Sequence, residues 1–167
     1  MIKSFNALLV TMFGLGKIKY MPGTFGSLAT VIVLYYLFHE LNVSTNIILI
    51  SLIIIFVCSF YAVSIHIENS KNKDPGEIII DEFLGQSIPI YLYEISHGTT
   101  KDSDEAIVYY VLFFILFRYF DIMKPFPVSF IDKNFKNSFG VIMDDICAGF
   151  YVVLTLVCFM IIKSYVL

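Results

Sequence analysis

The sequence has few charged residues. Charged side chains make up 15% of its 167 residues, hydrophobic side chains make up 58%, and the mean hydropathy is +0.82. Soluble domains carry about 25% charged and about 45–50% apolar residues. A soluble globule of this size lacks the interior to hide so much apolar surface. The scarcity of charge excludes an ordinary soluble domain and predicts that a lipid bilayer surrounds much of the chain.

Cysteine and histidine patterns are also sparse. The three cysteines, Cys58, Cys147 and Cys158, lie in or beside apolar runs without CxxC spacing, which indicates small core residues rather than a metal or disulfide site. No arginine stands six residues after any of them, which excludes a Cys-x5-Arg phosphatase loop. The histidines stand singly, so we expect structural or interfacial roles for them; they are His39, His66 and His97.

Other signals of processing or modularity are missing. The N-terminal stretch "MIKSFNALLVTMFG" has one lysine and no small-x-small cleavage site, so we expect it to stay in the mature chain. No internal repeat or low-complexity linker interrupts the sequence. Length and continuity predict one domain over residues 1–167.

Five apolar segments are present: Phe25–Phe38, Ile47–Ile67, Phe83–Ile95, Ala106–Phe120 and Ile146–Ile162. Ile47–Ile67 is long enough to span a hydrocarbon core of about 30 Å at about 1.5 Å per residue. The first, third and fourth segments are short for this task, and could be tilted, interfacial or buried. The pattern predicts an all-α integral membrane bundle of about four to five apolar helices, with the motif loops on one face.

Basic residues are distributed unevenly between the polar stretches. If all five segments cross, residues 1–24, 68–82 and 121–145 share one side of the membrane. That side, with Arg118 assigned to it, holds nine of the eleven Lys and Arg residues: Lys3, Lys17, Lys19, Lys71, Lys73, Arg118, Lys124, Lys133 and Lys136. Lys101 and Lys163 remain for the other side. The bias predicts that the first side is cytoplasmic.

The first motif-like stretch is "GLGKIKYMPGTFGS", residues Gly14 to Ser27. Gly23 would let the backbone approach an anion closely, and Thr24 or Ser27 could cap the helix that follows. The free N–H groups of that helix start would then form an anion site, with Lys17 and Lys19 adding positive charge. The alternative is a turn and N-cap that lead into a membrane helix.

The second stretch is "DPGEIIIDEFLG", residues Asp74 to Gly85. Pro75 suits the first turn of a helix, which would place Glu77 and Asp81 on one face. Glu77 has an ordinary explanation in the helix dipole. Asp81 and Glu82 stand between apolar runs, and a carboxylate pair in such surroundings suggests ligation of a hard cation.

The third and fourth stretches are "FRYFDIMKPFP" and "GVIMDDICAG". Arg118 and Asp121 lie on one helical face, and that helix should end by Lys124 because the next residue is a proline. Asp144 and Asp145 repeat the pattern of two adjacent acids within an apolar run. The alternative is an intrahelical Arg118–Asp121 salt bridge, with Asp144 and Asp145 marking a helix start. It would explain each site separately, but it does not predict that all the charged sites face the same side of the membrane.

Together these residues supply oxygen ligands for Mg²⁺ and cations for a phosphate group. With no cysteine or histidine nucleophile in view, metal-activated water is the expected attacking group. A small transporter or ion pathway is the main alternative, because intramembrane acids also mark cation routes. A lipid-headgroup transferase would show a DGxxAR-type motif, which this sequence lacks.

These stretches, in this order from Gly14 to Gly149, resemble the phosphatidylglycerophosphatase A family: "GLG" with "PGTFGSLA", "DP" with "IIIDEFLG", "FRYFDIMKPFP" and "GVIMDDICAG". The resemblance implies a Mg²⁺-dependent phosphatase of the bacterial inner membrane that hydrolyses phosphatidylglycerophosphate. It implies metal ligands or bases among Asp81, Glu82, Asp121, Asp144 and Asp145, and phosphate contacts from Arg118 and Lys124. The expected partners are a phospholipid substrate and the bilayer, with no nucleic acid; the sequence sets no oligomeric state.

Overall fold

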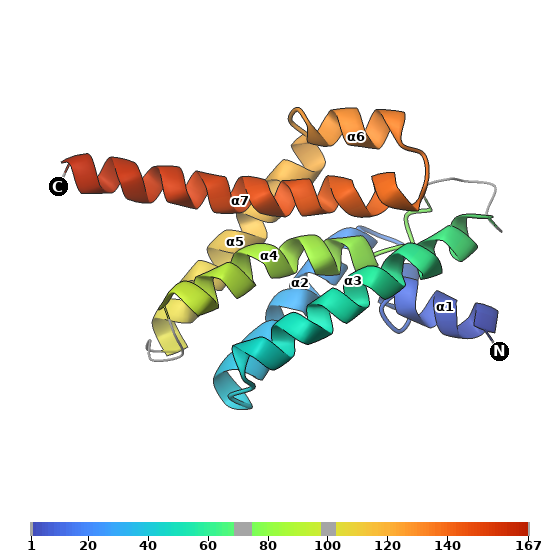
Figure 1. Ribbon diagram of the computed structural model, residues 1–167, viewed down its shortest axis with the longest axis horizontal. Coiled ribbons are helices and arrows are strands. Elements are labelled where there is room, and N and C mark those ends of the chain that lie inside the picture. The colour runs from blue at the N-terminus through green and yellow to red at the C-terminus, as the bar shows by residue number, and fades with distance from the viewer. Residues whose placement is uncertain (1, 69–74, 98–102, 167) are drawn as a thin grey trace.

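The computed structural model describes residues 2–68, 75–97 and 103–166. The described chain contains no strand and consists of helices joined by short turns (Figure 1). In chain order they are α1 (Ile2–Val10), the 3₁₀ turn η1 (Leu15–Lys17), α2 (Pro22–Tyr35), the π-helical turn η2 (Tyr36–Glu40), α3 (Thr45–Glu68), α4 (Ile80–His97), α5 (Ser103–Met123), α6 (Val128–Asn134) and α7 (Ser138–Val166). The predicted all-α class is confirmed. Lys71, Lys73 and Lys101 lie outside the described residues.

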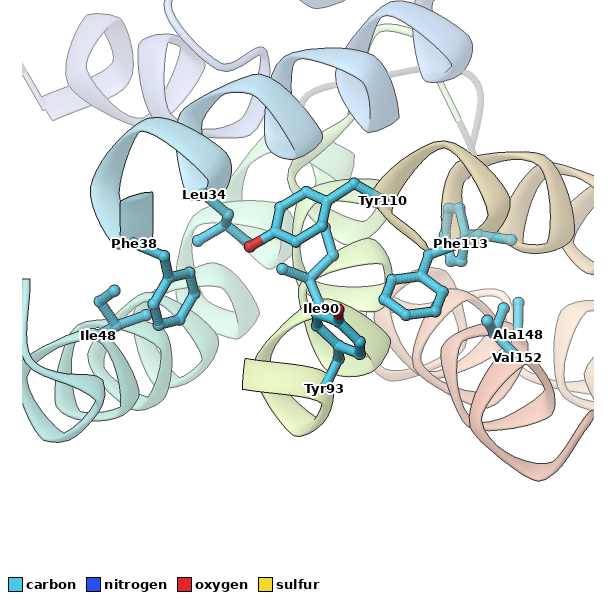
Figure 2. Close-up of a cluster of buried hydrophobic side chains, with 10 residues drawn as sticks. Leu34, Phe38, Ile48, Ile90, Tyr93, Tyr110, Phe113, Ala148 and Val152 are labelled. Atoms are coloured by element: carbon cyan, nitrogen blue, oxygen red, sulfur yellow. The ribbon is translucent and has the colours of Figure 1, made fainter. Parts of the chain in front are cut away.

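Helix α4 is the centre of the structure. It packs against α2, α3, α5 and α7, which surround it (Figure 1). A cluster of buried side chains from these helices covers the C-terminal half of α4. Figure 2 shows Ile90 and Tyr93 of α4 between Leu34, Phe113 and Val152. The helix is held in place by apolar packing on several sides.

The number of spanning helices differs from the prediction. Within the described residues, three helices are long and apolar enough to cross a membrane, with spans at Thr45–Glu68, Glu105–Met123 and Ser138–Tyr165. The apolar segments Phe25–Phe38 and Phe83–Ile95 belong to α2 and α4, which do not meet these criteria. Other helices cover most of α4, in which Leu84 and Ile90 are buried, whereas α2 has only 14 residues and keeps Ile32 exposed on its surface.

Several predicted helix boundaries need correction. Helix α2 begins at Pro22 after Met21, so neither Thr24 nor Ser27 caps it. Pro75 begins a turn and not a helix, because the Ile78 amide donates to its carbonyl and α4 starts only at Ile80. The predicted end of the helix before Lys124 is confirmed, since α5 ends at Met123.

Candidate functional site

A pocket of about 280 Å³ lies where the N-terminal ends of α2, α4 and α7 meet the C-terminal end of α5. We call this region the pocket end. Eight of the residues that the sequence singled out line it: Gly23, Asp81, Glu82, Arg118, Asp121, Lys124, Asp144 and Asp145. Residues from four separate stretches of the chain therefore share one cavity.

Three carboxylates form the acidic centre of the pocket. Asp81, Glu82 and Asp145 each offer an oxygen, and these oxygens lie within 4.8 Å of one another. Asp81 and Asp145 are buried, and Glu82 Oε2 is buried without a hydrogen-bond partner among the described residues. Like charges this close, and removed from water, are unfavourable unless a cation or protons compensate them.

Two glycines bring the acid pairs of α4 and α7 together. A Cβ at Gly85 of α4 would clash with the backbone carbonyl of Asp145 in α7. A Cβ at Gly149 would in turn clash with the backbone carbonyl of Gly85. Both contacts are with backbone, which cannot move aside as a side chain can. The two helices therefore cross at a separation that only glycine permits, and this crossing places Asp145 beside Asp81 and Glu82.

Arg118 lies beside the acidic centre. Its Nη1 donates to Asp121 Oδ2 at 2.7 Å, as the i,i+3 spacing predicted, and also to Ser27 Oγ at 3.4 Å. The Arg118 Nε atom is buried without a partner among the described residues. A Cβ at Gly23 would collide with Glu82 Oε1 and approach Arg118 Nη1. Gly23 therefore leaves room for an acid and a guanidinium to meet in the pocket.

Lys124 joins three elements at the pocket rim. Its ammonium group donates to Asp144 Oδ2 of α7 at 2.8 Å and to Asp132 Oδ1 of α6 at 3.1 Å. Burial would lower the pKa of Lys124, but the hydrogen bonds and negative charges of Asp144 and Asp132 outweigh it and raise that pKa. Lys124 is therefore protonated at neutral pH and holds α6 over the pocket.

Thr24 and Ser27 do not line the pocket. Thr24 Oγ1 is buried without a partner among the described residues. The Ser27 hydroxyl donates to the Gly23 carbonyl at 2.9 Å and accepts the bond from Arg118. The interpretation of these two residues as helix caps is wrong, because α2 begins before them. Ser27 reaches the pocket only through Arg118.

The sequence interpretation overlooked two residues of the pocket. Asp132 and Lys136 line it, and Lys136 Nζ lies 3.8 Å from Asp132 Oδ1. Their i,i+4 spacing shortly after "KPFP" is the sequence pattern that could have identified them. Helix α6 is short, however, and ends at Asn134, before Lys136. The interpretation of Asp144 and Asp145 as a helix start is also corrected, because α7 begins at Ser138 and both acids lie in its second turn.

Two histidines contact glutamate side chains away from the acidic centre. His66 Nε2 lies 2.8 Å from Glu77 Oε1 and connects the end of α3 to the turn before α4. At the opposite end of the bundle, His39 Nε2 lies 3.1 Å from Glu94 Oε1, which also accepts a hydrogen bond from the Tyr110 hydroxyl at 3.1 Å. These contacts agree with the expected structural role of both histidines.

The fold and the pocket define an all-helical protein with long apolar helices and a cavity that combines clustered carboxylates with cationic side chains. The family model of phosphatidylglycerophosphatase A matches residues 8–160. The chain therefore belongs to the phosphatidylglycerophosphatase A family, which confirms the resemblance of its motifs.

Curated relatives agree with this membership. The phosphatidylglycerophosphatase A of Haemophilus influenzae is 35% identical over 147 residues, which cover 88% of this chain and 83% of the relative. A Bacteroides thetaiotaomicron protein, provisionally named a phosphatidylinositol-3-phosphatase, is 34% identical over 149 residues, with 86% of each chain covered. The Escherichia coli phosphatidylglycerophosphatase A is 29% identical over 144 residues, covering 85% of this chain and 76% of the relative. No solved structure matches this chain.

Proposed function

We propose that this protein is a lipid phosphatase that hydrolyses the terminal phosphomonoester of phosphatidylglycerophosphate, giving phosphatidylglycerol and inorganic phosphate. The observation that carries the proposal is the convergence of carboxylates and cations from four chain segments on one pocket. The names of the relatives from Haemophilus influenzae and Escherichia coli supply the substrate. Family membership supplies the class of reaction.

The acidic centre fits a hard divalent cation. Asp81, Glu82 and Asp145 present only oxygen donors, and one buried oxygen of Glu82 lacks a partner among the described residues. Mg²⁺ prefers carboxylates and substrate phosphate oxygens as ligands. These three residues would hold the ion. When bound, Mg²⁺ polarises a phosphoryl oxygen and lowers the pKa of a bound water.

Arg118 and Lys124 bind the phosphomonoester in this proposal. The guanidinium of Arg118 is held by Asp121 at 2.7 Å, which fixes its orientation toward the pocket. Its planar donors suit a phosphate, and their charge offsets the negative charge that gathers on the equatorial oxygens during transfer. Lys124, already ordered by Asp144 and Asp132, supplies a second positive charge at the rim.

Asp121 is the acid that we assign to proton transfer. Both oxygens of Asp144 accept hydrogen bonds, from Lys124 and from the Asp145 amide. Among the described residues, Asp121 accepts through Oδ2 alone. Its second oxygen can accept a proton from the attacking water and thereby act as a general base.

The substrate is a membrane lipid, so the pocket should lie at the bilayer surface. The pocket end carries Arg118, Lys124 and Lys136, which belong to the side with most Lys and Arg residues. The positive-inside rule then supports a position at the cytoplasmic face of the bacterial inner membrane.

An ion pathway is less compatible with the packing. The other buried acid of α4, Glu94, is bound by His39 and Tyr110 at the opposite end. Fully buried apolar side chains, including Ile90, Phe113 and Phe117, belong to the core cluster between these ends. A phosphoinositide substrate is a second candidate, on the name of the Bacteroides thetaiotaomicron relative.

Phosphate release by the purified protein in detergent tests the proposal. We would compare phosphatidylglycerophosphate, phosphatidylinositol 3-phosphate and phosphatidic acid, each with Mg²⁺ and with a chelator. Release from phosphatidylglycerophosphate that requires Mg²⁺ and exceeds release from the other lipids is the expected result. Absence of release from all three lipids by folded protein would reject the phosphatase, and preference for the inositol lipid would change the substrate.

Mg²⁺ should also stabilise the protein, because a ligand that binds only the folded state raises the free energy of unfolding. At a hundredfold excess over Kd the gain is about 2.7 kcal/mol, which corresponds to a rise in Tm of roughly 5–10 °C. Glu82→Gln removes a negative charge from the acidic centre, so it should raise Tm without the ion and cancel the increase caused by Mg²⁺. Thermal unfolding in detergent measures both effects. An undiminished shift in Glu82→Gln would place the ion elsewhere.

A further inference from the structure

An apolar groove of about 360 Å³ lies between α3, α4 and α7. It is lined by Leu52, Phe56, Leu84, Ile88, Leu92 and Phe150, among others. Leu84 and Ser87 are buried and form its floor. The Ser87 hydroxyl donates to the Phe83 carbonyl at 2.6 Å, so the one hydroxyl of the floor is engaged by its own helix. The groove therefore offers almost no polar contact to an occupant.

The groove begins at the acidic centre. On α4, residues 81, 84, 88 and 92 follow the i, i+3, i+7, i+11 spacing of one helical face. Asp81 lines the pocket, and the three apolar residues of that face line the groove. On α7, Ile146 of the groove directly follows Asp145 of the pocket. A molecule whose polar headgroup occupies the pocket would have this apolar groove beside it.

The distance from the acidic centre to the far end of the groove matches one leaflet of a bilayer. From Asp81 to Leu92 the helix advances by about 16 Å, at about 1.5 Å per residue. Half of a hydrocarbon core of about 30 Å is about 15 Å. An acyl chain attached to a headgroup in the pocket would end near the bilayer midplane, where the groove ends.

We propose that the α3–α4–α7 groove binds one acyl chain of the lipid substrate while its phosphomonoester occupies the pocket. This inference rests on the proposed function and adds to it the site that recognises the lipid part. An acyl chain that enters the groove moves from one apolar environment to another, so the hydrophobic effect contributes little. Its binding is favoured by van der Waals contacts with the fixed surface of the groove. The groove fixes the headgroup over Asp81 by holding its tail along the same helical face.

Filling the groove tests the proposal. Ile53 lines the groove and is 52% exposed, so tryptophan can replace it without disturbing the core. Ile115 of α5 is 57% exposed and lines neither cavity, which makes Ile115→Trp a matched control. With dioleoyl phosphatidylglycerophosphate we expect Ile53→Trp to lower kcat/KM at least fivefold and Ile115→Trp to change it less than twofold. With the same headgroup lacking acyl chains, both variants should match the wild type.

A binding experiment that needs no turnover complements the kinetics. Phosphatidylglycerophosphate with a photoreactive diazirine in one acyl chain should label peptides of α3 and α4 that line the groove. Excess deacylated headgroup should reduce this labelling, because pocket and groove are occupied by the same molecule. Labelling of α5 around Ile115 should be unaffected.

Two outcomes would overturn the proposal while leaving the phosphatase intact. One is hydrolysis of the lipid by Ile53→Trp at the rate of Ile115→Trp. The other is groove labelling that the headgroup does not reduce, as bulk lipid would give. Failure of the proposed function is distinguishable, since the wild type would then release no phosphate from the lipid.

Discussion

Asp81→Asn and Asp145→Asn should each reduce phosphate release from phosphatidylglycerophosphate at least a thousandfold. The two side chains come from different helices and place oxygens within 4.8 Å of each other and of Glu82. Loss of either charge removes a ligand of the proposed ion and weakens the stabilisation of the transferring phosphoryl group. A thousandfold loss corresponds to about 4 kcal/mol of transition-state stabilisation. Phosphate release under saturating Mg²⁺ and lipid measures it.

The control for this experiment is Glu40→Gln. Glu40 is an exposed acid in η2, which precedes α3 at the end of the bundle away from the pocket. Its replacement removes the same charge and should leave the rate within twofold of the wild type. Retention of more than a tenth of the wild-type rate by either aspartate variant, with Tm preserved, would remove the acidic centre from the mechanism.

Gly85→Ala and Gly149→Ala should lower activity at least a hundredfold and also lower Tm. The added methyl group meets backbone in both cases: the Asp145 carbonyl for Gly85 and the Gly85 carbonyl for Gly149. The helices must move apart to admit it, which separates Asp145 from Asp81 and Glu82. A displacement near 1 Å at a catalytic site can cost about a hundredfold in rate. Activity and thermal unfolding of the same preparations measure the two effects.

Gly76→Ala is the control for the expected decrease in Tm of Gly85→Ala and Gly149→Ala. Nothing lies within 4 Å of a Cβ at Gly76, so its Tm should stay at or above that of the wild type. If Gly85→Ala and Gly149→Ala behaved like Gly76→Ala in Tm and kept full activity, the close crossing of α4 and α7 would have no part in forming the site.

The sequence was sufficient to predict the helical class and the main charged residues of the pocket. Adjacent acids within apolar runs, such as Asp81 with Glu82 and Asp144 with Asp145, are costly enough to indicate a shared purpose before any fold is known. The turn at Lys124 was equally clear, because Pro125 cannot follow a helical residue without strain. The adjacent acids and the helix end at Lys124 both depend on neighbouring residues in the chain, so a single sequence is enough to predict them.

Long-range packing determined what the sequence did not reveal. Apolar composition alone could not separate α4, which other helices cover, from a helix covered by lipid, and so its segment was counted with the spanning helices. The segment of α2 was counted as well, although this helix has only 14 residues. Thr24 and Ser27 looked like helix caps, although Pro22 at the first position of α2 marks a helix start before both of them. Asp132 could be recognised as a pocket residue only from the structure, in which α6 lies over the pocket and Asp132 pairs with Lys124.

The burial of α4 also bears on biogenesis. Its sequence is too polar to meet the criteria for a spanning helix, and it carries Glu94 in a position that becomes fully enclosed. Alone in lipid, the Glu94 carboxyl group would lack hydrogen-bond partners. Among the described residues, Glu94 obtains its partners from η2 and α5, through His39 and Tyr110. We therefore expect α4 to leave the translocon only when α5 has been synthesised, so that membrane insertion and tertiary folding of this helix are a single step.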